Sequence, residues 1–373
     1  MRIAVIGAGA VGGVIAALAD RAGHEVTVTA RGEHLAVIRG RGLQLSGRWG
    51  EHLARPYAAE LLDATAPRPD LALLCVKAQD ASSALAANAT ALEGVPLVVV
   101  QNGLGGAEAA AAQLPGTPVI GGLALFAASY LEPGQVSVTT GGATYLGRPA
   151  SASPAGASPD SASPAGAGPD PASPTAPPSP APASDPSAGI PDPFSLAVDT
   201  LSALMPIATT DNFTGAQWTK LLVNHVNALP AITGLPVQQT IADARLRAVL
   251  LASMRETIGI ARARGVSFEP LLGLDERMLR VVHRAPRILA QLVPRAMARR
   301  MGATPNPGST LQSIRRGQLT EIDHLNGAVV EAAADIGRKA PVNAALVALV
   351  HAVERDHRFR TPAEVTRATL AAP

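Results

Sequence analysis

The sequence predicts an α/β domain with a mainly parallel sheet, followed by a second domain that is mainly α-helical. Three observations lead to this fold class. Residues 1–149 alternate short apolar runs with helical stretches, as parallel α/β sheets do. Residues 150–193 are rich in Pro, Ala and Ser and contain no aromatic residue. From residue 194 to residue 373 the apolar side chains follow a helical period.

The predicted sheet begins with four short apolar runs, which cover residues 2–7, 24–31, 71–77 and 96–102. A helix from about Val11 to Ala22 joins the first two strands. The later two runs are apolar on both faces, as buried parallel strands are. After Pro118 the pattern changes to hairpin-like strands, and we expect these to extend the same sheet.

The segment 150–193 separates the two expected domains. It contains the near repeat SASPAGASPD and SASPAGAGPD, followed by a Pro/Ala/Ser tract. Such a segment buries too little apolar surface to offset the entropy lost on ordering. We expect a disordered insertion, and docking of an unknown partner on it stays open.

Composition narrows the class of protein. The formal net charge is only +2, so the arginines between Arg280 and Arg300 indicate solvated helix faces and not a nucleic-acid site. The single cysteine, Cys75, excludes an internal disulfide and is expected to be a buried, inert thiol. The sequence offers neither a metal-ligand pattern nor a membrane span. We therefore expect a cytoplasmic enzyme, and a homodimer stays open.

A glycine motif follows the first expected strand directly and opens the first helix. Gly7, Gly9 and Gly12 have the G-x-G-x-x-G spacing of a Rossmann-type dinucleotide loop. The first glycine permits a tight turn, the second lets a pyrophosphate approach the backbone, and the third lets helix and strand pack closely. The expected cofactor-binding residues of this loop are Gly7, Ala8, Gly9, Ala10, Val11 and Gly12.

The residues that end the later strands extend this expected cofactor site. Arg31 stands where an acidic residue would bind the ribose of NAD, and its cation suits the 2′-phosphate of NADP(H), although Glu33 is close. Lys77 and Asn102 end two further strands, at the sheet edge where ligands bind. Asn102–Gly103 is equally well explained as a turn dipeptide.

A polar stripe marks the start of the helical domain. Residues 213–230 predict a helix interrupted near Pro230. Lys220 and Asn224 are four residues apart and share a face, and Asn227 is about 20° from Lys220 around the helix. His225 points elsewhere and is expected to be structural. The stripe presents an ammonium group and two amides, although a solvated surface would explain it as well.

A second polar group lies between residues 306 and 327. Ser309 with Gln312 has capping-box spacing, as has Thr320 with Asp323. Glu321 is expected in the first helical turn, where a glutamate is favourable on dipole grounds alone. A capping role and a ligand-binding role are both open for these side chains.

Together these motifs resemble those of the ketopantoate reductase (2-dehydropantoate 2-reductase) family. The resemblance runs in order through GAGAVGG, Arg31, VKAQD around Lys77, QNG around Asn102, WTKLLVN (218–224) and GSTLQSIRRGQLTEID (308–323). It implies a Rossmann domain joined to a helical domain like the C-terminal domain of 6-phosphogluconate dehydrogenase. The active site would lie between the two domains.

The resemblance also implies roles for individual residues. Lys220 would be the general acid, and Glu321 would hold the lysine and the substrate hydroxyl. Asn224 and Ser309 would bind the substrate, the latter near its carboxylate. Asn102 would bridge cofactor and substrate, and Lys77 would lie at their junction. The implied reaction is reduction of ketopantoate to (R)-pantoate by NADPH, a step of pantothenate and coenzyme A biosynthesis.

The chain departs from the family pattern at two positions. The family has a second asparagine eight residues after the lysine, where this chain has Ala228, so that Asn227 would substitute. Ser313 stands where the family often has aspartate. The alternatives are therefore a reductase of another small 2-ketoacid or imine, and a non-catalytic NADP(H)-binding regulator.

Overall fold

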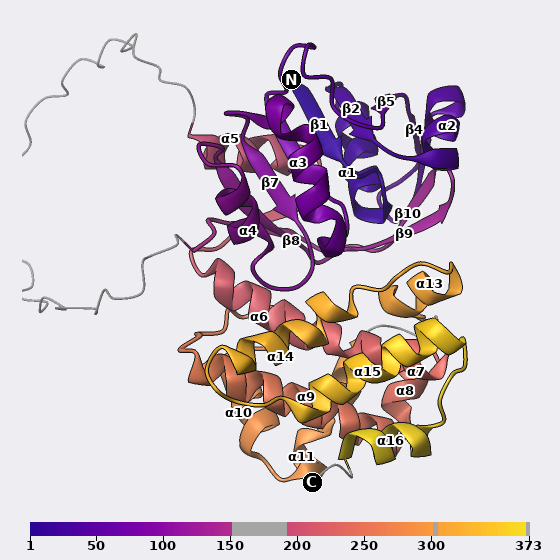
Figure 1. Ribbon diagram of the computed structural model, residues 1–373, viewed down its shortest axis with the longest axis vertical. Coiled ribbons are helices and arrows are strands. Elements are labelled where there is room, and N and C mark those ends of the chain that lie inside the picture. Colours follow the sequence, from indigo (N-terminus) through magenta and orange to yellow (C-terminus); the bar gives the residue numbers. More distant parts are fainter. Residues whose placement is uncertain (151–191, 301–304, 371–373) are drawn as a thin grey trace, which may run out of the picture.

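The chain forms a sheet-containing body and a helical body, stacked one above the other in Figure 1. The computed structural model describes residues 1–150, 192–300 and 305–370. The expected insertion 150–193 lies, apart from its ends, outside the described residues. In the described part of the chain, no helix is long and apolar enough to cross a membrane.

The main sheet confirms the predicted parallel α/β domain. Its strands are, in spatial order, β12 (Ile207–Thr209), β11 (Thr144–Gly147), β8 (Val119–Ala124), β7 (Leu97–Val100), β6 (Leu71–Leu74), β1 (Arg2–Ile6), β2 (Glu25–Thr29) and β5 (Tyr57–Ala59). All neighbours pair parallel except β8 and β11. Every residue of β6 and β7 is buried, because helices cover both faces of the sheet.

The helices of this body are α1 (Ala10–Arg21), α2 (Gly32–Arg41), the 3₁₀ turn η1 (Ala78–Asp80), α3 (Ala81–Leu92), α4 (Gly106–Gln113) and α5 (Pro193–Ser202). The strand–turn–helix unit β1–α1 confirms the element order expected around the glycine motif.

A second sheet corrects the expectation that the strands after Pro118 all extend the first. Its order is β4 (His52–Ala54), β3 (Leu43–Gly47), β10 (Gln135–Thr140) and β9 (Ala127–Glu132). Of the strands between Pro118 and Arg148, β8 and β11 join the main sheet. The hairpin β9–β10 instead pairs through β10 with β3, a strand that comes much earlier in the chain.

The expected start of the helical domain at residue 194 is too early. Helix α5 packs into the core of the sheet body through Ala197 and Leu201. Strand β12 then pairs parallel with β11 and completes the main sheet. A strand of three residues is too short to display a period of two, so the sequence pattern did not reveal it.

The helical body confirms the mainly α-helical expectation. Its elements are α6 (Phe213–Asn224), η2 (His225–Asn227), α7 (Ala228–Thr233), α8 (Val237–Ala242), α9 (Ala244–Ala263), α10 (Glu276–Arg284), α11 (Arg287–Ala290), α12 (Leu292–Arg300), α13 (Ser309–Arg315), η3 (Ile322–His324), α14 (Asn326–Ala334), α15 (Pro341–Asp356) and α16 (Pro362–Leu370). The long helix α9 supplies Leu246, Leu250, Met254 and Ile258 to one core, as its apolar stripe predicts.

The helix expected over residues 213–230 is broken earlier than predicted. Helix α6 ends at Asn224, the 3₁₀ turn η2 follows, and α7 begins at Ala228. Pro230 lies in the first turn of α7, where no intrahelical N–H bond is needed, so it does not interrupt a helix.

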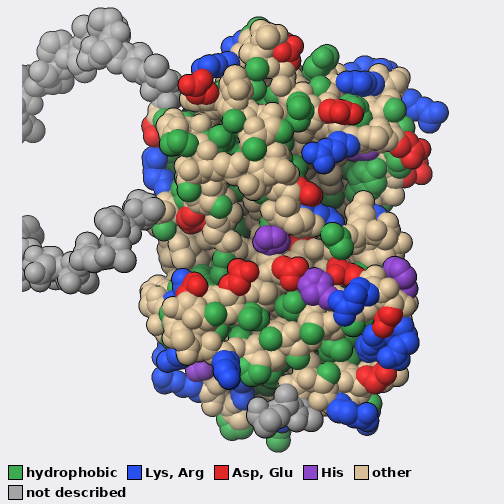
Figure 2. Space-filling model, viewed as in Figure 1, with side chains coloured by type: hydrophobic (Ala, Val, Ile, Leu, Met, Phe, Trp, Pro, Cys, Tyr) green, Lys and Arg blue, Asp and Glu red, His purple; other side chains and the backbone are tan. Residues whose placement is uncertain are grey.

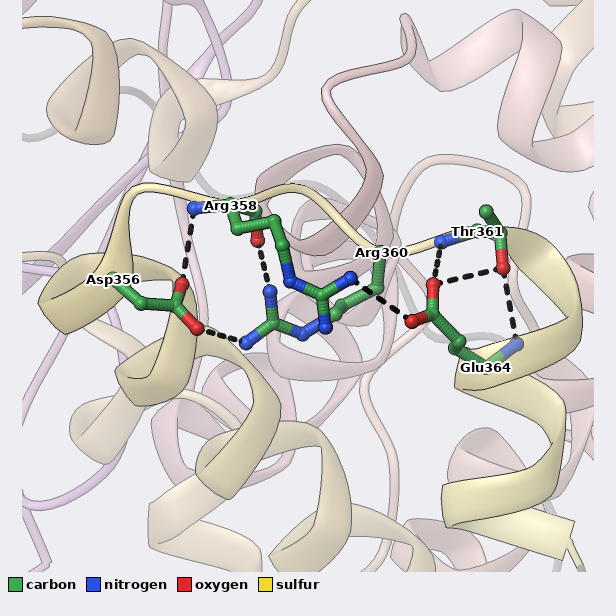
Figure 3. Close-up of polar contacts among 5 residues, drawn as sticks. All are labelled: Asp356, Arg358, Arg360, Thr361 and Glu364. Atoms are coloured by element: carbon green, nitrogen blue, oxygen red, sulfur yellow. Dashed lines mark hydrogen bonds and ion pairs between the residues drawn. The ribbon is translucent and has the colours of Figure 1, made fainter.

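Figure 3 shows how the last helix is anchored. Thr361 and Glu364 form a reciprocal capping box: the Thr361 amide donates to Glu364 at 2.7 Å, and the Glu364 amide donates to Thr361 Oγ1 at 3.3 Å. Glu364 also pairs with Arg358 at 3.1 Å, and Arg360 pairs with Asp356. The segment between α15 and α16 is thus held by ion pairs and a cap.

Candidate active site

The glycine loop between β1 and α1 has no room for side chains at two of its three glycines. Gly7 has φ +98°, and a Cβ there would lie 2.6 Å from Val76 Cγ1. A Cβ on Gly12 would lie 2.1 Å from the carbonyl oxygen of Gly7. At Gly9, by contrast, a Cβ would meet nothing within 4 Å. The loop is therefore tightly packed at its ends and open in the middle, as a phosphate cradle requires.

The loop is tied to the neighbouring strand and opens into a helix. The amides of Gly7 and Ala8 donate to the side chain and carbonyl of Thr29, each at 2.9 Å. Ala10 and Val11 begin α1, where the first amides have no partner within the helix and can bind an anion. These residues fit a dinucleotide.

Arg31 lies just beyond β2, at the N-cap of α2, and is exposed. Its guanidinium is thus on the same edge of the sheet as the loop, where the adenosine end of a dinucleotide would extend.

Lys220 is the most buried charged group of the expected site. It lies on α6 and is 8% exposed. Burial lowers the pKa of its ammonium group to about 8, while the negative charge of Glu321 opposes this shift. A lysine with such a pKa can both hold and release a proton near neutral pH.

Asn102 joins the sheet body to two segments of the helical body. Its Nδ2 donates to Glu321 Oε2 at 3.5 Å, and its Oδ1 accepts from Asn224 Nδ2 at 3.5 Å. The other oxygen of Glu321 accepts from the amide of Ala78 at 3.4 Å. Four side chains therefore meet where the two bodies join. Lys220 and Asn224 come from one helix, and Asn102 and Glu321 reach them from distant parts of the chain.

Lys77 also crosses the junction of the two bodies. Its Nζ donates to Ser313 Oγ at 3.3 Å and to the carbonyl of Leu319 at 2.7 Å. Burial lowers the pKa of Lys77, and the nearby Glu321 counteracts this. Lys77 is thus held beside the catalytic candidates by the helical body, and Ser313, one of the two departures, is its partner.

Ser309 is the first residue of α13, and Asn227 lies against the turn that precedes it. The N-cap of α13 is Gly308, so the expected capping box of Ser309 with Gln312 is wrong; Ser309 is exposed. A Cβ on Gly308 would lie 2.7 Å from Asn227 Oδ1, which places Asn227 against this turn.

The second expected capping box is also wrong. Glu321 precedes the 3₁₀ turn η3, and no side chain caps that turn. Thr320 Oγ1 accepts only from the amide of Ile322, at 3.3 Å. Glu321 is therefore directed by a turn, and not by the first turn of an α-helix.

Two residues have the structural character that their sequence context predicts. His225 is fully buried, hydrogen-bonded to Thr257 at 2.7 Å and Asn326 at 3.0 Å, and burial lowers its pKa to about 4. Burial likewise raises the pKa of the Cys75 thiol to about 12, so it is not a nucleophile. Among the described residues, no group of three His, Cys, Asp or Glu side chains could hold a metal ion.

The sequence did not reveal the contacts that hold the two bodies together. The guanidinium of Arg316 donates to the carbonyl of Tyr130 and lies 5.4 Å from the centre of its ring. The backbone at Gly103 is so close to His324 that a Cβ would lie 2.4 Å from its carbonyl oxygen. Figure 2 shows acidic and histidine side chains gathered along this junction. Such contacts depend on how the bodies pack and have no local sequence signal.

The parallel sheet carries a dinucleotide loop, and the attached helical body carries a buried lysine beside a glutamate. This combination defines an NAD(P)-dependent oxidoreductase. Residues 3–151 match the family Ketopantoate reductase PanE/ApbA, and residues 212–354 match Ketopantoate reductase PanE/ApbA C terminal. The chain belongs to the PanE/ApbA ketopantoate reductase family.

Relatives match over nearly the whole chain. A 2-dehydropantoate 2-reductase from Halobacterium salinarum is 28% identical, with 95% of this chain and 100% of the relative covered. A PanE/ApbA family ketopantoate reductase structure from Ralstonia eutropha is 30% identical, with a TM-score of 0.71 and 95% and 99% of the two chains covered. D-Mandelate dehydrogenase with NADH and anilino(oxo)acetate shares the fold, with a TM-score of 0.73, 20% identity and coverage of 95% and 99%.

Proposed function

We propose that the protein reduces 2-dehydropantoate to (R)-pantoate with NADPH. The observation that carries this proposal is the lysine at the junction of the two bodies. Lys220 is buried, has a pKa lowered to about 8, and lies within the electrostatic influence of Glu321. A regulator that only binds NADP(H) has no need of such a proton donor.

The chain's own residues would handle the proton and orient the substrate. When bound, the nicotinamide supplies the hydride that adds to the C2 carbonyl carbon. As the carbonyl π electrons move to oxygen, Lys220 Nζ donates a proton to that oxygen, and the neutral amine is reprotonated from solvent. This general acid assistance is typically worth about 10²–10⁴-fold in rate. Glu321 keeps the lysine charged and accepts a hydrogen bond from the product hydroxyl.

The remaining polar side chains would fix the substrate. Asn224 and Asn102 already contact each other and would present their amides to the keto acid. Ser309, exposed at the start of α13, would bind the carboxylate, and Asn227 lies against the preceding Gly308. Lys77 adds positive charge near the same junction and favours an anionic substrate.

Arg31 supports NADPH over NADH as the cofactor. Arg31 is exposed and follows β2, at the position where an acidic side chain would bind an unphosphorylated ribose, and Glu33 lies two residues further on. A 2′-phosphate there would gain charge-assisted hydrogen bonds.

A second candidate function is reduction of a different 2-ketoacid. Ala228 is 1% exposed and lies in an apolar core, where the resemblance expects an asparagine. Ser313 meets Lys77 where the family often has aspartate. The fold is also that of D-mandelate dehydrogenase, which holds anilino(oxo)acetate, an oxo acid amide.

These proposals are tested by steady-state rates with 2-dehydropantoate and with a panel of other 2-ketoacids. Each substrate is assayed with NADPH and with NADH. We expect the highest kcat/KM with 2-dehydropantoate and NADPH. A higher value with another 2-ketoacid supports the second candidate, and NADPH binding without turnover of any substrate supports a regulator instead. The cytoplasmic location, the homodimer and docking on the insertion stay predictions.

A further inference from the structure

The imidazole of His34 connects the glycine loop to a distant part of the sheet body. His34 lies in the first turn of α2, three residues after Arg31. Its Nε2 is 2.7 Å from the carbonyl oxygen of Ala8 in the loop. Its Nδ1 accepts from the amide of Gly134, in the turn between β9 and β10, at 2.9 Å. One side chain therefore joins the loop, α2 and the second sheet.

These two contacts fix the protonation of the ring. Because Nδ1 accepts a hydrogen bond, it carries a lone pair, so the proton is on Nε2. Nε2 therefore donates to the Ala8 carbonyl. Burial lowers the pKa of His34, which keeps the ring neutral at pH 7.

The contact with Ala8 determines where the next amide points. In a trans peptide the carbonyl and the following N–H lie in one plane and point in opposite directions. With the Ala8 carbonyl directed at His34, the N–H of Gly9 is directed away from it, on the exposed side of the loop. Gly9 is also the glycine beside which the space is open.

We propose that His34 is a positioning residue that turns the Gly9 amide toward a cofactor phosphate and ties the loop to α2, the helix that Arg31 precedes. This inference rests on the proposed nicotinamide cofactor. The ring of His34 is itself supported by Tyr130, whose ring lies edge-on at 4.9 Å and receives Arg316 from the helical body. The loop is thereby linked to the junction of the two bodies.

Three substitutions separate the donor from the acceptor. His34→Gln keeps an amide N–H at the position of Nε2, His34→Asn keeps an oxygen at the position of Nδ1, and His34→Phe keeps only the ring beside Tyr130. His52→Gln is the matched control, because His52 is a partly buried histidine of the same body that bonds Asp20 instead. The dissociation constant of NADPH is measured by fluorescence titration, and folding by thermal unfolding.

We expect His34→Asn and His34→Phe to weaken NADPH binding about 3- to 10-fold, the range of one hydrogen bond. His34→Gln and His52→Gln should stay within about twofold of the wild type, and kcat at saturating NADPH should be unchanged in all four variants.

Equal weakening in the Gln and Asn variants, or unchanged binding in His34→Phe, overturns the inference. If the Asn or Phe variant is unfolded while His34→Gln is folded, the Ala8 contact is required for folding, and a cofactor-specific role is likewise overturned. If the wild-type protein fails to bind NADPH in the same titration, the proposed function itself is refuted. The titration therefore distinguishes failure of the proposed function from failure of the His34 inference.

Discussion

Replacing Lys220 by methionine should abolish most of the turnover and stabilise the fold. Methionine matches the length of the lysine stem and carries no charge. Lys220 is only 8% exposed, and burial lowers the pKa of its ammonium group from 10.5 to about 8. The fold therefore holds this charge at a cost, which is a common property of catalytic sites.

The cost follows from the difference between the two pKa values. At pH 7 the charged lysine is disfavoured in the folded state by about 3 kcal/mol, since one pKa unit corresponds to about 1.36 kcal/mol. Methionine removes this term, and Lys77 remains as a positive neighbour of Glu321. We expect the free energy of unfolding at pH 7 to rise by about 1–3 kcal/mol.

The folded and unfolded pKa values of Lys220 also determine how its contribution to stability changes with pH. Between pH 8 and 10.5 the unfolded chain binds this proton more strongly than the folded chain, so the lysine's contribution to stability becomes more favourable as pH rises. The protonated fraction is about 90% at pH 7 and about 10% at pH 9. The wild-type kcat should therefore fall about tenfold per pH unit above 8.

The change in stability is measured by urea unfolding of the wild type and Lys220→Met at pH 7 and pH 10. The loss of the catalytic proton is measured by the dependence of the wild-type kcat on pH. Lys339→Met is the control, because Lys339 is exposed and lies between α14 and α15. A Lys220→Met protein that is less stable than the wild type at pH 7, or that keeps near-normal turnover, would refute the reasoning. A kcat that stays constant to pH 10 would refute the assignment of the proton to Lys220.

Four further substitutions test other parts of the structure. Arg31→Ala should raise the KM for NADPH about tenfold with little effect on NADH, in steady-state assays, because only the former offers a 2′-phosphate. Gly12→Ala should abolish cofactor binding in a titration, since its Cβ would lie 2.1 Å from the Gly7 carbonyl oxygen, whereas Gly9→Ala should remain folded. Bonds from Thr361 lower the pKa of Glu364 to about 2, from 4.5, so the stability it adds is present above pH 4.5 and is lost as pH falls toward 2. The Tm difference between the wild type and Glu364→Gln should therefore be larger at pH 7 than at pH 3.

The features that the sequence predicted are those that local pattern determines. The strand, glycine turn and helix from Arg2 to Arg21 follow from residues that adjoin in the chain. Lys220 and Asn224 share one uninterrupted helix, so their spacing was informative.

The features that the sequence missed depend on distant partners. Strand β12 is defined by its pairing with β11 across the insertion, and the hairpin β9–β10 by its pairing with β3. Both Lys77 and His34 acquire their roles from groups more than 20 residues away. Periodicity carries no information about such pairings, because it reports only which face of an element is buried.

The break after α6 accounts for one departure from the family pattern. On a continuous α-helix, residues three and four places after Asn224 would both lie on about its own face. A 3₁₀ turn has about three residues per turn, so through η2 the residue three places on returns to the direction of Asn224 and the fourth rotates away. The third residue after Asn224 is Asn227, which lies against the turn before Ser309. The fourth is Ala228, which is 1% exposed in the apolar core. An asparagine at 228 would bury an amide there without an evident partner, so the early asparagine and the tighter turn compensate for each other.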